Sequence, residues 1–497
     1  MRSKNKDGKI RRENGVLLPL FSLSGKYGIG SMGREAYRFI DFLRAARQTY
    51  WQLLPLCPVG KGNSPYSSTS SFAGEILLID MELLADEGFL EPQELPPEPE
   101  NPQKIDYDAV RAVKLPLLRK AAERFDVHDR DFRKFANDNA DWLDDFAVFS
   151  AIKQVTGDLP IGDFPEGLKY RIPEALDAFI AEHFEVVEFY RITQYFFYRQ
   201  YFSLKAYAER NGIRLIGDLP FYVQLESADV WSNPSNFRLG RDLTPVLVAG
   251  VPPDAFSDEG QLWGNPIYDW NYLRSTGYAF WKTRLRHQAR LYDVIRIDHF
   301  RAFADYYTCP YGAKDAKSGV WEKGVGLPFW QQMQKEIGAE IIAEDLGTDS
   351  PEVRRLITDT GFPNMKVLQF AFDSDLENPH LPKNYERNCV CYTGTHDNDT
   401  TRGWFEKADA HRLRLFSQLV PADESHSAVY SLIRYAVSSK ARIVMVPMQD
   451  YLQLDSSARL NTPGVPTGNW EWRLVGGELT EELCQTIIRL CKTGFGI

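Results

Sequence analysis

Eight short runs of apolar, mostly β-branched residues recur along the chain, and each leads into polar residues and then into a helical pattern. The runs are GVLLPLF (15–21), TYWQLLPL (49–56), IRLIGDLP (213–220), DVIRIDHF (293–300), EIIAEDLG (340–347), MKVLQFAF (365–372), NCVCYTGTHD (388–397) and ARIVMVPMQD (441–450). Near-continuous apolar strands that alternate with helices are typical of a parallel sheet covered on both faces. Eight such units predict an α/β fold of the (β/α)8 TIM-barrel type, and a doubly wound open sheet is the competing architecture.

One long stretch of the chain does not follow this repeat. It contains EPQELPPEPENPQ (91–103), whose proline and glutamate content is typical of a surface loop, and then helical patterns such as 132–154. We therefore predict a single barrel domain over 1–497, with a mainly helical subdomain inserted into an early barrel loop at about 75–190. The aromatic-rich helix expected at 187–212 should pack between this subdomain and the barrel.

The composition excludes several classes of partner. Acidic residues outnumber basic residues by 68 to 58, which argues against a nucleic-acid partner because such a partner needs a basic surface. No stretch approaches the roughly 18 apolar residues of a membrane span, and the basic N-terminus lacks the apolar run of a secretory signal. The six cysteines show no zinc-type pairs. We expect a cytoplasmic protein with neither a nucleic-acid nor a membrane partner.

Three of the predicted strands lead into an acidic residue. Asp298, Glu344 and Asp397 lie towards the ends of the fourth, fifth and seventh runs, so in a barrel all three would converge on the carboxyl-end rim. Neighbouring strands lie about 4.8 Å apart, close to the roughly 5–5.5 Å between the two carboxyls of a retaining glycosidase. The pattern favours chemistry on a glycosidic bond, which needs a proton donor and a negative group.

The neighbours of the three acids suggest a role for each. Arg296 lies two residues before Asp298 on the same strand face, and a close guanidinium favours the ionised form that a nucleophile needs. Glu344 follows three apolar residues and would face two aspartates, so burial and like charge should raise its pKa and make it the general acid and base. Asp397, beside His396, would hold sugar hydroxyls and stabilise the transition state.

The same residues allow other interpretations. Arg296 and Asp298 could form a structural ion pair, and Asp397 or Asp399 could cap a helix. Acids at a barrel rim also bind metals, but the chain has only eight histidines and neither a His-x-His nor an HExxH motif, so we predict no metal and no cofactor. A carbohydrate-binding protein without catalysis is a further alternative.

Several long motifs resemble the 4-alpha-glucanotransferases, a family of the α-amylase clan that includes amylomaltase and disproportionating enzyme. They occur in order from about residue 15 to 475: GKYGIGSMG (25–33), NSPYS (63–67), IGDLPFYV (216–223), GVPPDAFSDEGQLWGNP (250–266), RIDHFR (296–301), AEDLG (343–347), THDND (395–399) and NTPGVPTGNWEWR (461–473). The resemblance implies Asp298 as nucleophile, Glu344 as general acid and base, and Asp397 as transition-state stabiliser.

The resemblance also implies a set of substrate-binding residues. Around the donor sugar it indicates Tyr66, Asp218, Arg296 and His396, with Ser64 of the NSPYS motif; in loops that arch over the glucan it indicates Gln261, Trp263 and Asn469. A loop insertion at about 225–275 is expected to lie over the active site. Without the family, Tyr66 could simply occupy a turn, Asp218 could cap the next helix, and Trp263 could pack within its own loop.

What the resemblance implies about function is transfer rather than cleavage. An α-1,4-glucan segment would move from a donor maltooligosaccharide to the 4-hydroxyl of an acceptor glucan or glucose, through a covalent glucosyl-aspartate. The alternative is an α-1,4-glucan hydrolase with the same three acids, and a metal-dependent barrel hydrolase is a more distant one. About 45 residues follow the eighth strand, too few for the C-terminal β-sandwich of α-amylases.

Overall fold

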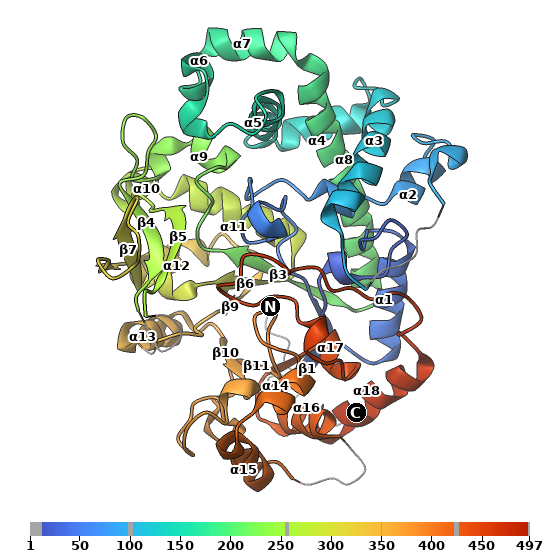
Figure 1. The fold of residues 1–497 in the computed structure, drawn as a ribbon, viewed down its shortest axis with the longest axis vertical. Coiled ribbons are helices and arrows are strands. Elements are labelled where there is room, and N and C mark those ends of the chain that lie inside the picture. Colours follow the sequence, from blue (N-terminus) through green and yellow to red (C-terminus); the bar gives the residue numbers. More distant parts are fainter. Residues whose placement is uncertain (1–11, 98–102, 254–257, 349, 422–426, 496–497) are drawn as a thin grey trace.

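Eight parallel strands form a closed barrel in the computed structural model, which describes residues 12–97, 103–253, 258–348, 350–421 and 427–495. They are β1 (Glu13–Leu17), β2 (Tyr50–Gln52), β3 (Arg214–Pro220), β6 (Val294–Asp298), β9 (Glu340–Ala343), β10 (Asn364–Val367), β11 (Cys389–Tyr392) and β12 (Ile443–Pro447). Each predicted run overlaps one of these strands. The order around the barrel is β1-β12-β11-β10-β9-β6-β3-β2, so the (β/α)8 prediction is confirmed and the open sheet is excluded (Figure 1).

The register of the strands brings their carboxyl ends to one rim. Pro220 of β3 pairs with Asp298 of β6, and Ile297 of β6 pairs with Ala343 of β9. Residues at or just beyond these positions therefore face the same side of the barrel, which is the side where barrel enzymes carry their chemistry.

Helices surround the strands, as Figure 1 shows. Their ends follow local sequence signals: α13, for example, begins after Ser350, whose side chain accepts a hydrogen bond from the Val353 amide, and ends at Gly361, whose φ is 69°. The helices of this group are α1 (Arg34–Ala45), α8 (Phe184–Arg210), α11 (Ala279–Leu291), α12 (Gly326–Met333), α13 (Pro351–Thr360), α14 (Thr401–Lys407), α15 (Ala410–Leu419), α16 (Ala428–Ser438), α17 (Met448–Tyr451) and α18 (Glu481–Phe495). The described residues after β12 form no further named strand.

The segment between β2 and β3 is helical and stands at the top of Figure 1. It contains α2 (Met81–Asp86), α3 (Tyr107–Glu123), α4 (Arg130–Asp138), α5 (Leu143–Val155), α6 (Glu166–Lys169) and α7 (Pro173–Glu182), and α8 then leads back to the barrel. Tyr195, Phe196 and Phe197 of α8 are buried, and the Phe196 ring lies 5.1 Å from that of Phe89. The aromatic residues of α8 thus pack within the core, as predicted.

A second, antiparallel sheet lies beside the barrel, at the left of Figure 1. Its order is β5-β4-β7-β8, with β4 (Leu247–Val251) and β5 (Gln261–Pro266) from the segment between β3 and β6. The other two strands, β7 (Asp305–Pro310) and β8 (Val320–Lys323), come from the segment between β6 and β9. Short helices α9 (Ala228–Ser232) and α10 (Trp270–Ser275) flank β4 and β5. The sequence predicts only a loop insertion at about 225–275, and its pattern does not indicate this sheet.

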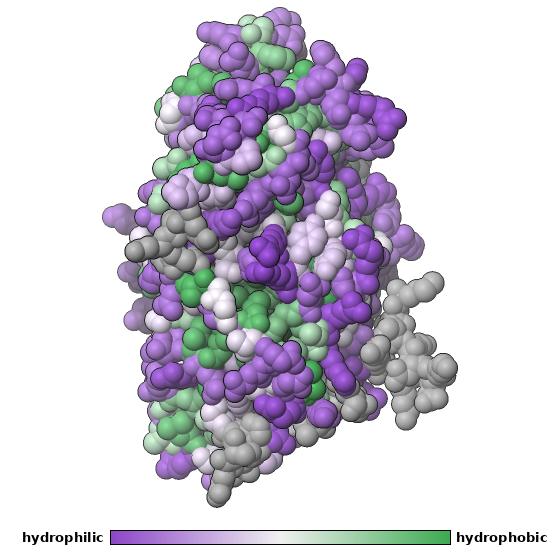
Figure 2. Space-filling model, turned by 90° about the vertical axis from the view of Figure 1, so that its right-hand side faces the viewer, coloured by the Kyte–Doolittle hydropathy of each residue, from purple (hydrophilic) through white to green (hydrophobic). Residues whose placement is uncertain are grey.

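The face in Figure 2 is mainly hydrophilic, with apolar residues gathered below its centre. Among the described residues, no helix combines the length and apolar character needed to cross a bilayer. All six cysteines are described and none forms a disulfide.

Candidate active site

Asp298 ends strand β6 and lies against a buried arginine. Arg296 Nη2 is 3.0 Å from Asp298 Oδ1, and Arg296 Nη1 donates to both carboxylate oxygens of Asp218, at 2.7 and 2.6 Å. The side chains of Arg296 and Asp298 are 3% and 30% exposed. One guanidinium therefore bridges two carboxylates, and Asp298 is the one that faces the open side of the site.

Glu344 follows strand β9, next to β6 in the barrel, and is buried. Its two oxygens accept hydrogen bonds from the backbone amides of His299, at 2.7 Å, and Leu346, at 2.5 Å. Burial raises the pKa of Glu344 to about 8, against the opposing charge of Arg296 and with the support of Asp298. The carboxyl of Glu344 is therefore mostly protonated at neutral pH, as the sequence analysis expected.

Asp397 lies in the loop that follows β11. Asn461 Nδ2 donates to Asp397 Oδ1 at 2.6 Å, and His396 Nε2 is 3.3 Å from Asp397 Oδ2. Burial opposes the ionised form, but His396 and the Asn461 hydrogen bond outweigh it and hold the pKa of Asp397 well below its ordinary value. The side chain remains 43% exposed. Asp397 is thus a carboxylate held in a fixed position and open on one side.

The interpretation of Asp397, Asp399 or Asp218 as helix caps is wrong. The N-cap of α14 is Thr400, whose hydroxyl accepts the hydrogen bond from the Gly403 amide. Asp218 does not cap α9 either, because Ser227 accepts the hydrogen bond from the Val230 amide there.

Tyr66 joins Asp218 to His396. Its hydroxyl donates to Asp218 Oδ2 at 2.8 Å, and its ring is nearly parallel to that of His396, with the centroids 5.1 Å apart. Burial, with Asp218 adding to it, raises the pKa of Tyr66 well above its ordinary value, so the hydroxyl keeps its proton as a donor. Ser64 supports the turn, since its hydroxyl accepts from the Tyr66 amide at 3.3 Å.

Two further predicted residues approach the site from the small sheet. Trp263 Nε1 donates to Gln261 Oε1 at 3.1 Å, and the Trp263 ring packs edge-on against His299 with the centroids 4.9 Å apart. His299 follows Asp298 directly, and its backbone has a φ of 53°. Burial lowers the pKa of His299 to about 4, so the imidazole is neutral at pH 7. Trp263 therefore packs against a residue of the site and not only within its own loop.

Asn469 is less directly connected to the acids. Its side chain accepts from the Thr462 amide at 2.9 Å and donates to the Val465 carbonyl at 2.7 Å, so both hydrogen bonds stay within the 461–470 loop. The loop contacts the site through Asn461. Besides the side-chain bond to Asp397, the backbone amide of Asn461 donates to the His396 carbonyl at 3.2 Å.

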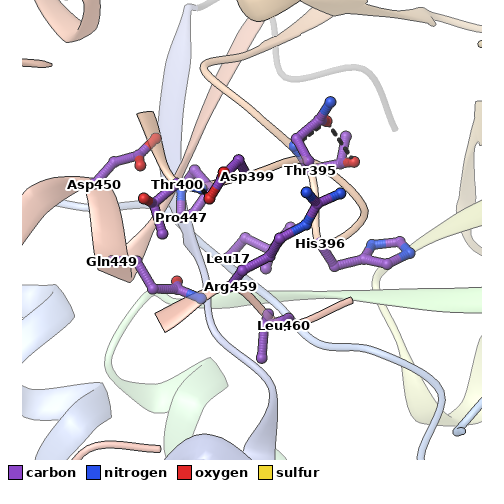
Figure 3. Close-up of a pocket in the computed structure, with 11 residues that line it drawn as sticks. Leu17, Thr395, His396, Asp399, Thr400, Pro447, Gln449, Asp450, Arg459 and Leu460 are labelled. Atoms are coloured by element: carbon purple, nitrogen blue, oxygen red, sulfur yellow. Dashed lines mark hydrogen bonds between the residues drawn. The ribbon is translucent and has the colours of Figure 1, made fainter. Parts of the chain in front are cut away.

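His299 and Asn461 were not among the residues predicted for the site. A usable signal existed for both, because His299 is adjacent to Asp298 and Asn461 opens the NTPGVPTGNWEWR motif. A small pocket, shown in Figure 3, is lined by Leu17, Thr395, His396, Asn398, Asp399, Thr400, Pro447, Gln449, Asp450, Arg459 and Leu460.

A closed (β/α)8 barrel whose rim carries an arginine-paired carboxylate beside a buried protonated carboxyl defines a class of enzyme that acts on glycosidic bonds. In the described part of the chain, no three or more His, Cys, Asp or Glu side chains are grouped as metal ligands would be. The 4-alpha-glucanotransferase family model matches residues 18–479, and the chain belongs to this family.

Individual relatives align with nearly the whole length of this chain. The 4-alpha-glucanotransferase of Clostridium butyricum is 43% identical and covers 95% of this chain and 98% of its own length. That of Thermus thermophilus is also 43% identical, with 95% and 97% covered. Among solved structures, the amylomaltase from Streptococcus agalactiae in complex with acarbose has a TM-score of 0.94 and 36% identity, covering 98% of this chain and 99% of that one.

Proposed function

We propose that this 4-alpha-glucanotransferase works by retaining double displacement, with Asp298 as nucleophile, Glu344 as acid and base, and Asp397 as transition-state stabiliser. In the first step, the Asp298 carboxylate attacks the anomeric carbon of the donor sugar while Glu344 gives its proton to the departing glycosidic oxygen. A glucosyl ester of Asp298 forms and the freed segment leaves. In the second step, Glu344 takes the proton of the acceptor 4-hydroxyl, whose oxygen displaces Asp298 and forms a new α-1,4 linkage.

The contrast between the two neighbouring carboxyls carries this proposal. Asp298 is 30% exposed and 3.0 Å from the guanidinium of Arg296, whereas Glu344 is buried and its pKa is raised to about 8. One group is thus suited to attack and the other to deliver a proton, and environments that separate two carboxyls in this way are the usual basis of acid and nucleophile assignments.

The proposed substrates are maltooligosaccharides, α-1,4-glucans and, as acceptor, glucose. The buried hydrogen-bonded group of Tyr66, Asp218 and Arg296, together with His396, would bind the hydroxyls of the donor sugar and the face of its ring. Ser64 supports Tyr66, while Gln261, Trp263 and Asn469 would contact the glucan from the loops on either side. These residues recognise an uncharged, hydroxyl-rich chain.

The alternative activity is hydrolysis by the same three acids, in which water replaces the acceptor sugar. Maltotriose distinguishes the two when chain lengths and total reducing ends are followed together. Transfer spreads the chain lengths while the number of reducing ends stays constant, because one linkage forms for each that breaks. A count of reducing ends that rises in proportion to turnover would contradict transfer.

We also propose a domain organisation and a cellular location for the enzyme. The helical segment at about 75–190 and the segment at about 225–275 are taken as units inserted around one catalytic barrel, which agrees with their positions between β2 and β3 and between β3 and β6. A cytoplasmic location is supported by six unpaired cysteines, the pattern of proteins in reducing compartments.

A further inference from the structure

A buried aspartate outside the proposed catalytic group makes an unusual set of contacts. Asp450 lies in α17, just beyond strand β12, and is 1% exposed. Its Oδ2 accepts hydrogen bonds from the hydroxyls of Thr393 and Thr401, both at 2.6 Å, and its Oδ1 accepts from the Thr401 amide at 2.7 Å. All three donors belong to residues 393–401, so the carboxylate binds only this segment through its hydrogen bonds.

The two threonines mark the two ends of the loop that carries Asp397. Thr393 is the first residue after β11, and Thr401 is the first residue of α14. A single carboxylate therefore holds both ends of residues 393–401 together, across the end of the neighbouring strand β12. This arrangement fixes where the loop leaves the barrel and where it returns.

Asp450 is separated from the sugar-binding side of this loop. Figure 3 places Asp450 and His396 on opposite sides of the pocket, with Asp399 and Thr400 between them. Any influence of Asp450 on the reaction is therefore indirect and passes through the loop. Within the loop, the Asn398 carboxamide oxygen accepts from the amide and the hydroxyl of Thr395, each at 2.8 Å, and the Thr395 hydroxyl oxygen accepts from the Asp397 amide at 3.3 Å, so Asp397 belongs to one hydrogen-bonded turn with its neighbours.

We propose that Asp450 is a positioning residue for the catalytic loop 393–401 and sets the location of Asp397 at the transition state. The inference rests on the role proposed above for Asp397. It predicts that geometry matters more than charge at this position, because what the loop needs is three matched hydrogen bonds.

Substitutions at position 450 can separate the effect of hydrogen-bond geometry from the effect of the negative charge. An asparagine can keep a hydrogen bond to each of the three groups, two of them reversed: its carboxamide oxygen accepts from the Thr401 amide, and its NH2 group donates to the two hydroxyl oxygens, which accept as well as donate. An alanine removes every contact and leaves the buried Thr401 amide without a partner. D450N should therefore keep the loop in place, and D450A should release it.

The test compares D450A and D450N with wild type, using maltotriose disproportionation to obtain kcat and KM. We expect D450A to lower kcat and kcat/KM together by about 10- to 100-fold, the scale of effect expected when a catalytic group is misplaced by about 1 Å. D450N should stay within about 3-fold of wild type. Hydrogen exchange of the 393–401 peptide should be faster in D450A and unchanged in D450N.

A matched control separates positioning from general stability. Asp80 is also buried and accepts from a hydroxyl, that of Ser31 at 2.6 Å, and from the Leu83 amide at 3.0 Å, but it caps α2 in the helical segment. D80A should lower Tm and leave kcat unchanged. If D450A does not fold, the double variant T393V/T401V removes both hydroxyl donors at nearly constant volume, and its kcat should fall while its KM is retained.

Three results would overturn the inference: wild-type kcat in D450A or in T393V/T401V, or a D450N variant as impaired as D450A, which would mean that charge decides. D397A, assayed alongside, separates this outcome from a failure of the proposed function. An active D397A removes the role of Asp397 itself, whereas an inactive D397A beside a fully active D450A removes only the positioning role of Asp450.

Discussion

At the scale of single residues, the site depends on two groups: the Arg296 guanidinium, which contacts two carboxylates, and the His299 backbone amide, which binds a third. Arg296 contacts both Asp218 and Asp298, and the His299 amide binds Glu344, so three strand ends are linked within two residues of Asp298. Charge-assisted and buried hydrogen bonds of this kind hold side chains in place before a substrate arrives. The proposed chemistry therefore relies on a site that is organised in advance.

The first prediction concerns the nucleophile. D298A should lower disproportionation of maltotriose by at least roughly 1,000-fold, because no covalent intermediate can form. Folding should be preserved, since Arg296 keeps its two hydrogen bonds to Asp218. Circular dichroism and the Tm measure the fold in parallel with activity. Substantial turnover by a folded D298A would rule out this residue as the nucleophile.

The second prediction concerns the proton donor. With its pKa raised to about 8, Glu344 loses its proton as the pH rises through that value, so kcat/KM for maltotriose should decline there. E344Q should be nearly inactive on maltotriose yet retain slow reaction with α-maltosyl fluoride, whose leaving group needs no proton. Equal loss with the natural and the activated donor would contradict the role of general acid.

At the scale of elements, strand packing controls the position of the side chains at the rim. Gly217 precedes Asp218 in β3, and a Cβ atom at this position would come within 2.0 Å of a ring carbon of Tyr292. Only a residue without a side chain fits between the strand and that ring. The location of Asp218, and through it that of Arg296, therefore depends on a close contact beneath the site.

The third prediction follows from this contact. G217A should destabilise the protein by about 1–3 kcal/mol, the usual cost of overpacking, and should lower activity because β3 must shift. G338A is the matched control, since a Cβ atom there would meet nothing within 4 Å. Thermal unfolding and maltotriose turnover measure the two effects. A G217A variant with the stability and activity of G338A would show that β3 tolerates the change.

The small antiparallel sheet supplies the fourth prediction. Trp263 of β5 covers His299, the residue after Asp298, with ring centroids 4.9 Å apart. Removing the ring in W263A should admit water to the glucosyl intermediate, so the ratio of reducing ends released to segments transferred should rise roughly several-fold. The total rate of donor cleavage should change less than this ratio. An unchanged ratio would mean that other groups exclude water.

At the scale of the whole molecule, the barrel could be predicted because buried parallel strands leave continuous apolar runs in the sequence. The convergence of the strand ends at Asp298 and Glu344 could be predicted because a barrel brings the carboxyl ends of its strands to one rim, whereas the catalytic roles of the three acids remain a proposal. The small sheet was missed because two of its strands, β5 and β8, are largely exposed and so leave no continuous apolar run; in β5, buried positions begin only at Asn265. The contacts of Asp397 with Asn461 and of Asp450 with Thr393 span 64 and 57 residues, and no local pattern marks them.

The fifth prediction concerns the stability of the folded chain. Because burial raises the pKa of Glu344 from an ordinary value of 4.5 to about 8, the folded state binds a proton that the unfolded state releases between these values. The contribution of Glu344 to stability is thus fully present below about 4.5 and is lost as the pH rises through about 8. E344Q should unfold at a higher temperature than wild type at pH 9, and the difference should shrink at pH 5.

The hydrogen-bonded neighbours β1 and β12 are the first and last strands of the barrel along the chain. On the ribosome, a growing polypeptide therefore exposes unpaired edges of β1 and β11 until Ile443–Pro447 has emerged from the exit tunnel. The barrel, and with it the rim that carries Asp298, Glu344 and Asp397, closes only when this last strand has paired with the first.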